Sequence, residues 1–203
     1  MQCIIFEMEQ SLLEFVDAKG ILRTADVEDA GYYRVQLTRL VHAGQLVREA
    51  PGVYMTAKHE VTEWHDLAIL SLAIPNAVVS LISALAFHGV GTQLPREHWI
   101  TVPQGSRIPK FTQPMRVMTA AEDFYATGIE LHDIESVNVA VYSIEKTIAD
   151  CFKHRSKVGI DVAVEALKDA WQQRCITLAG LSHFAHINRV YKVMEPYMQM
   201  LMD

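Results

Sequence analysis

Glycines divide the first part of the chain into three short helical runs, and the positions of these glycines constrain the fold more than any other feature. Apolar residues recur at helical spacing over residues 4–16. Thr24 is expected to cap a second, shorter helix over residues 25–30, and a third helix is expected over residues 32–43. The glycines that end these runs are Gly20, Gly31 and Gly44. Glycine is favoured immediately after a helix end, so three separate helices are predicted.

A Pro-Gly turn follows the third helix. Residues 46–48 and 53–55 form two short apolar runs, separated by a turn that contains Pro51 and Gly52. Two such runs around a Pro-Gly turn predict a β-hairpin. Three helices followed by a hairpin are the layout of a winged helix-turn-helix. The sequence therefore predicts a DNA-binding domain of this type over residues 1–58.

The third predicted helix has a polar face without a carboxylate. At 100° per residue, Leu37 shares an apolar side with Tyr33, and Arg39 lies opposite, on a polar side flanked by Gln36. Arginine pairs with guanine edges and with phosphates, whereas a carboxylate would be repelled by phosphates. The residues expected to contact DNA are Thr24, Tyr32, Arg34, Val35, Thr38, Arg39, His42 and Arg48. The alternative is an ordinary solvated helix face.

The rest of the chain mixes helices and strands. A helix over residues 59–74 is expected to end at Pro75, and Asn76 is expected to cap a buried helix over residues 77–88. Strands are expected over residues 98–102, 115–118, 127–133 and 137–142, and helices over residues 143–153, 160–174, 178–187 and from 190 to the end. Most connections between these strands are too short for helical crossovers, which predicts an antiparallel or mixed sheet; a small, mostly antiparallel sheet is the expected form. The expected fold class is α+β, with a C-terminal α/β domain of this sheet and flanking helices over residues 59–203.

The charge balance limits how the chain can bind nucleic acid. Lys and Arg total 18 against 24 Asp and Glu, which gives a net charge of −6. An overall basic coat is therefore excluded, and DNA binding requires a local patch. No apolar run reaches the ~18 residues of a membrane span, so no membrane association is expected. Cys3, Cys151 and Cys175 lack CxxC spacing, which fits a reducing compartment and predicts a cytoplasmic protein.

Four sequence blocks occur together in the order that is typical of a known family. They are GQLVREAPGVYM, SLISALAFHGVG, HWITVP and VYSIEKTIADCFKHRSKVGIDVAVEAL. The most specific parts are the Ser-Ala-Leu-x-x-His-Gly run at residues 83–89 and the Ser-x-Glu-x-Thr-x-x-Asp run at residues 143–150. Over residues 5–175, the chain resembles the AbiEi family, which comprises antitoxins and transcriptional regulators of type IV toxin–antitoxin systems.

The resemblance implies a fold and a function. Such proteins carry an N-terminal winged helix-turn-helix and a C-terminal antitoxin domain, and they bind inverted repeats upstream of their own operon as repressors. The C-terminal domain counteracts a nucleotidyltransferase toxin, without a stable complex between the two proteins. The resemblance thus implies double-stranded DNA as a partner, a dimer on that DNA, and a functional rather than physical link to a toxin.

Basic residues outside the winged domain form a second candidate patch. They are Lys146, Lys153, Arg155 and Lys157. These side chains could add phosphate contacts, face an acidic partner, or simply be solvated. A Met-rich stripe near the C-terminus is either core or a partner surface. Its residues are Tyr191, Met194, Met198, Leu201 and Met202.

Two motifs raise the question of catalysis. Ser143-x-x-Lys146 matches an acyl-serine motif but lacks the later motifs that complete it, so Ser143 is interpreted as a helix cap. His183 and His186 lie on one helix face without a supporting carboxylate. No catalytic residue, cofactor or metal is predicted, and an enzyme is not expected. The alternative function is a winged-helix regulator whose C-terminal domain senses a small ligand or binds a partner protein.

Overall fold

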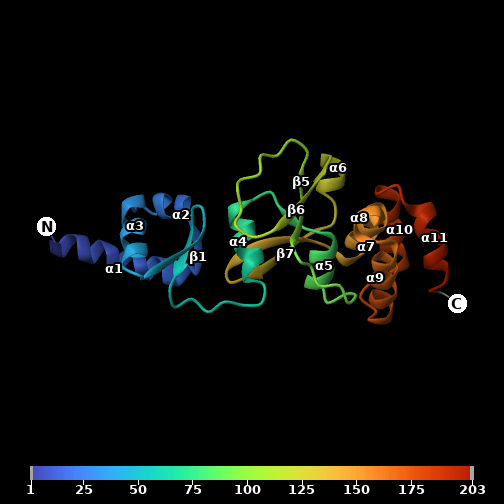
Figure 1. Cartoon of the computed structure of the whole chain (residues 1–203), viewed down its shortest axis with the longest axis horizontal. Coiled ribbons are helices and arrows are strands. Elements are labelled where there is room, and N and C mark those ends of the chain that lie inside the picture. The colour runs from blue at the N-terminus through green and yellow to red at the C-terminus, as the bar shows by residue number, and fades with distance from the viewer. Residues whose placement is uncertain (1, 202–203) are drawn as a thin grey trace. The chain divides into compact units, whose positions relative to one another are not determined.

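The computed structural model describes the backbone of residues 2–201 and the side chains of residues 8–201 (Figure 1). Cys3 and Met202 therefore lie outside the described side chains. The chain forms two compact units. The N-terminal unit ends at Pro75 and also includes Ile108–Thr112 and His132–Val139, and the remaining residues form the C-terminal unit. The domain boundary expected after residue 58 stays a prediction.

Three helices and a three-stranded sheet open the N-terminal unit. The elements in chain order are α1 (Gln2–Lys19), β1 (Ile21–Arg23), α2 (Thr24–Asp29), α3 (Arg34–His42), β2 (Leu46–Ala50), β3 (Val53–Thr56) and α4 (His65–Ala73). The antiparallel sheet has the order β1-β3-β2. The order of the three helices and the hairpin is the predicted one, and β1 adds a strand that the sequence pattern did not indicate because it has three residues.

Apolar side chains from α1, β1, α2, α3 and β2 meet in one core. The fully buried members are Leu12, Val16, Leu22, Val27, Leu37, Leu40 and Leu46. Helix α3 ends where Gly44 takes a φ of 69°, which lets the N–H of Gln45 reach the Leu40 carbonyl at 2.9 Å. The buried side of α3 is thus fixed by the core, and its C-terminal end is fixed by Gly44.

Three local predictions in the first 90 residues are wrong. Thr24 does not cap α2; it is the first helical residue, and the Asp26 carboxylate accepts the Arg23 N–H at 2.7 Å instead. The helix expected over residues 59–74 begins only at His65, because the N–H and the hydroxyl of Thr62 donate to the Glu135 carboxylate instead. The helix expected over residues 77–88 begins with a strand, β4 (Val78–Val79), since these β-branched residues pair in a sheet.

The larger sheet is mixed. Its strands are β4, β5 (His98–Pro103), β6 (Met115–Ala120), β7 (Ile129–Ile134) and β8 (Val137–Tyr142), in the order β6-β5-β4-β8-β7. Strand β5 pairs parallel with β6, and β4 pairs parallel with β8, whereas β4 and β5 are antiparallel. The expectation of a mostly antiparallel sheet is therefore wrong, because the proline-rich segment over residues 104–114 is long enough to return the chain without a helix.

The helices of the C-terminal unit are α5 (Leu81–Phe87), α6 (Glu122–Tyr125), α7 (Ile144–Lys153), α8 (Arg155–Val158), α9 (Ile160–Gln172), α10 (Leu178–Ile187) and α11 (Tyr191–Gln199). They include a group, α7 to α11, that lies together at the C-terminal end of the chain (Figure 1). Ser143 caps α7, as predicted, by accepting the Lys146 N–H at 3.4 Å. Met194 and Met198 are buried in the core of this unit, so these two residues of the Met-rich stripe are core residues. In the described part of the chain, no helix is both long and apolar enough to cross a membrane.

Candidate nucleic-acid interface

Helix α3 presents a broad exposed side to solvent. Leu37 and Leu40 are buried, whereas Val35 is 54% exposed despite its apolar side chain. The other exposed residues predicted to contact DNA on this helix are Arg34, Thr38, Arg39 and His42. No carboxylate belongs to α3 itself. The helix therefore offers an accessible basic and polar side that the core holds in place.

The structure changes the assignment of two residues beside this face. Tyr33, which helical spacing placed on the apolar side, is 66% exposed because it precedes the helix and has an extended backbone. Gln36, expected to flank the polar face, is buried, and its Oε1 accepts the Tyr33 N–H at 2.8 Å. Helical spacing alone could not place Tyr33, because the angle argument holds only inside a helix. Tyr33 thus joins the exposed surface, and Gln36 fixes the start of α3.

Tyr32 and Thr24 are tied to other parts of the N-terminal unit. The Tyr32 hydroxyl lies 2.8 Å from the Ser11 hydroxyl, and its ring centroid lies 5.7 Å from that of Phe15. Thr24 Oγ1 donates to the Gly52 carbonyl at 3.4 Å, which links α2 to the turn of the β2–β3 hairpin. Arg48 lies exposed on β2 of the same hairpin, opposite Tyr54. Tyr32 and Thr24 are thus placed to orient the surface, and Arg48 lies on the hairpin itself.

Both arginines of α3 are paired with carboxylates of neighbouring helices. Arg34 donates to Glu28 of α2 through two nitrogens, with Nη2 at 2.9 Å from Oε2. The guanidinium lowers the pKa of the Glu28 carboxyl below its ordinary value. Arg39 Nη1 lies 3.6 Å from Glu9 Oε1 of α1. A phosphate that approaches α3 would have to compete with these carboxylates for the two guanidinium groups.

The segment that builds this surface matches a known family. Residues 10–57 match the AbiEi antitoxin family of transcriptional regulators. The resemblance found in the sequence is thereby confirmed over these residues, hereafter the AbiEi segment. It contains α2, α3 and the β2–β3 hairpin complete. Every residue predicted to contact DNA falls inside it.

A solved structure shares the fold of the chain beyond the AbiEi segment. It is the crystal structure of the RV2827C protein from Mycobacterium tuberculosis, with a TM-score of 0.63 and 14% sequence identity. The match covers 95% of this chain and 78% of the other chain. At this identity the likeness shows the fold alone. No curated protein matches the chain in sequence.

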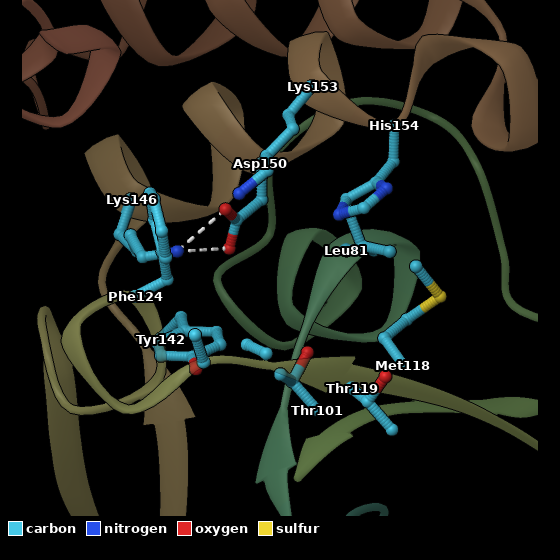
Figure 2. Close-up of a pocket in the computed structure, with 12 residues that line it drawn as sticks. Leu81, Thr101, Met118, Thr119, Phe124, Tyr142, Lys146, Asp150, Lys153 and His154 are labelled. Atoms are coloured by element: carbon cyan, nitrogen blue, oxygen red, sulfur yellow. Dashed lines mark hydrogen bonds and ion pairs between the residues drawn. The ribbon is translucent and has the colours of Figure 1, made fainter. Parts of the chain in front are cut away.

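The basic residues of the second candidate patch, downstream of the AbiEi segment, differ in their exposure. Lys146 is buried, and its Nζ lies 2.6 Å from both carboxylate oxygens of Asp150 (Figure 2). Lys153 is half-buried, with its Nζ 4.0 Å from the centroid of the Phe124 ring. Arg155 and Lys157 are exposed. Lys146 is thus held in a buried ion pair with Asp150, whereas Arg155 and Lys157 are accessible to a partner.

The histidine pair near the C-terminus has aromatic neighbours. His186 stacks on Tyr191 with ring centroids 4.3 Å apart, and His183 meets Phe184 edge-on at 5.0 Å. Within residues 8–201, no group of three His, Cys, Asp or Glu side chains is placed to hold a metal ion.

Proposed function

We propose that the protein is a DNA-binding repressor of its own operon and the antitoxin of a type IV toxin–antitoxin system. The observation that carries the proposal is the exposed side of α3 within the AbiEi segment, to which the helix itself contributes two arginines and no carboxylate. In this proposal, α3 enters a major groove, where Arg34, Thr38 and Arg39 contact bases and phosphates. Arg48 on the hairpin contacts the adjacent backbone. Repression follows because the bound protein blocks access to the promoter.

The proposal has further parts, for which the AbiEi resemblance is the main support. One such domain buries little DNA surface, so tight binding requires two copies on an inverted repeat. The antitoxin activity would counteract a nucleotidyltransferase toxin without a stable complex, and no catalytic step is assigned to this chain. The protein is proposed to act in the cytoplasm, where its operon is transcribed.

Arg39→Ala is expected to weaken binding to the protein's own upstream DNA about tenfold, since a base or phosphate contact is worth about 1–3 kcal/mol. The measurement is fluorescence anisotropy with upstream and scrambled DNA over a salt series. Removing a phosphate contact should also flatten the salt dependence. Arg39→Lys, which keeps the charge but loses the planar fork, should retain binding to scrambled DNA. Equal, weak binding of the wild-type protein to both DNAs would contradict the repressor function.

Glu28→Gln is expected to strengthen binding to DNA of any sequence by a factor of about two to five, because it releases Arg34 from an exposed ion pair. The same anisotropy assay at low salt measures the change. Asp29→Asn, at the exposed next position of α2, changes the net charge equally but has no ion pair with Arg34. If both variants bind equally well, the effect is one of net charge, and the competition between Glu28 and DNA is refuted.

A further inference from the structure

The C-terminal unit contains a pocket beside the end of α7. Its volume is about 220 Å³. Strands β5 and β6 contribute Thr101 and Thr119, α6 contributes Phe124, and the end of α7 contributes Lys153, followed by His154. In Figure 2 the Lys146–Asp150 pair lies on one side of this space, His154 on the other, and the two threonines below. Polar side chains from separate elements thus converge on one small cavity.

The carboxylate in the pocket wall is already neutralised. Both oxygens of Asp150 accept from Lys146 Nζ at 2.6 Å, and Oδ1 also accepts from Asn188 Nδ2 at 2.7 Å. Among the described residues, Lys153 forms no ion pair; its ammonium faces the Phe124 ring, and the Asp150 charge that acts on it is already paired with Lys146. Glu122 and Asp123, next to Phe124 in sequence, are exposed and do not line the cavity. The pocket therefore keeps an uncompensated positive charge.

Two further cations lie beside the pocket without lining it. Lys157 Nζ lies 3.7 Å from the sulfur of Met118, which lines the cavity, and Arg189 lies 5.9 Å from the Phe124 ring centroid. Burial lowers the pKa of Lys153, and it also lowers the pKa of His154. The charges that act on His154 are those of Asp150 and three lysines. This concentration of cations is notable in a chain with a net charge of −6, and it favours an anion in the cavity.

We propose that this pocket binds a small ligand through a phosphate group. Lys153 Nζ would pair with the phosphate, and the His154 imidazole and the Thr119 hydroxyl would donate hydrogen bonds to its oxygens. The volume lies below the ~300–1,000 Å³ that is typical of sites for larger ligands, so the occupant is inorganic phosphate or a small phosphate monoester. This site does not depend on DNA binding, and its test is separate from that of the repressor function.

The test is isothermal titration of the full-length protein with sodium phosphate and with glycerol phosphate, each against sodium chloride at equal ionic strength. Lys153→Met keeps the apolar stem on Phe124 but removes the charge, and Lys168→Met removes an exposed lysine of α9 as the matched control. Phosphate binding is expected to weaken about tenfold or more in Lys153→Met and to be unchanged in Lys168→Met. Binding of the monoester alone would identify a phosphorylated metabolite, and binding of both would identify the phosphate group itself.

His154 gives a second readout that does not rely on the Lys153 variant. Phosphate is expected to shift the imidazole proton signals of His154 in the NMR spectrum of the wild-type protein, and His154→Gln identifies those signals. Far-UV circular dichroism of each variant checks that it is folded. The proposal is overturned if phosphate and chloride behave alike, or if a folded Lys153→Met protein binds phosphate as tightly as the wild type.

Discussion

Replacing Lys146 by methionine is expected to lower the free energy of unfolding by about 3–5 kcal/mol, because it leaves the Asp150 carboxylate without its cation. Lys146 is 2% exposed and Asp150 is 7% exposed, so the ion pair is almost entirely removed from bulk solvent. The ammonium also lies 4.5 Å from the centroid of the Tyr142 ring. Urea unfolding followed by circular dichroism and by the fluorescence of the three tryptophans, Trp64, Trp99 and Trp171, measures the change.

A double-mutant cycle separates the ion pair from the packing of the lysine stem. Asp150→Leu alone should also destabilise the protein, because it leaves the Lys146 ammonium and the Asn188 amide without an acceptor. The double variant Lys146→Met/Asp150→Leu should be more stable than the sum of the single effects predicts, since apolar replacement of a buried pair is often tolerated. Additive losses would show that the pair contributes no coupling, and that the lysine acts only through its packing.

Glu135→Gln is expected to lower the free energy of unfolding by about 2–3 kcal/mol at pH 7. Glu135 has a 3% exposed side chain and a left-handed backbone with a φ of 54° in the turn between β7 and β8. Its carboxylate accepts the Thr62 N–H at 2.7 Å and the Thr62 hydroxyl at 2.8 Å, and it lies 2.9 Å from His59 Nε2 and 2.7 Å from His65 Nδ1. The variant loses the charge that these groups bind.

The same carboxylate predicts how stability depends on pH. Burial alone would raise the pKa of Glu135, but hydrogen bonds from Thr62, His65 and His59 outweigh it and lower this pKa from 4.5 to about 2. A lowered pKa in the folded state means that the stabilisation is complete above pH 4.5 and is lost as the pH falls toward 2. Wild-type stability should therefore fall over this range more steeply than that of Glu135→Gln. Glu63→Gln, an exposed neighbour, should follow the wild-type curve.

Sequence patterns predicted those elements whose signals are local. Gly44 and the spacing of Leu37 and Leu40 were sufficient to place α3, and the Pro-Gly turn was sufficient to place the β2–β3 hairpin. The pairing of Val78 and Val79 in the mixed sheet was missed, because an apolar run next to a helix has no period of its own. Whether such a segment forms a strand or a helix depends on its long-range contacts.

For the charged residues, too, the sequence predicted the local spacing but not the partners that the fold provides. The Lys146–Asp150 spacing of four residues equally fits an exposed pair on a helix surface, and the sequence assigned Lys146 to a basic patch. Its burial depends on the neighbours of α7, which the sequence does not order in space. The carboxylates that pair with Arg34 and Arg39 also come from other helices. The exposed face of α3 could therefore be predicted from the sequence, but the carboxylates that compete with DNA for its arginines could not.

The contacts of Glu135 limit where the chain can be truncated or recombined. The chain passes between the two units after residues 75, 107, 112, 131 and 139, so it crosses five times. A fragment that ends at Pro75 would contain His59 and His65 but would leave their carboxylate behind. A recombination event that exchanges only the first 75 residues between relatives would create the same mismatch. The two units are therefore expected to be inherited together. Substitutions in the turn between β7 and β8 are expected to accompany substitutions in the segment before α4.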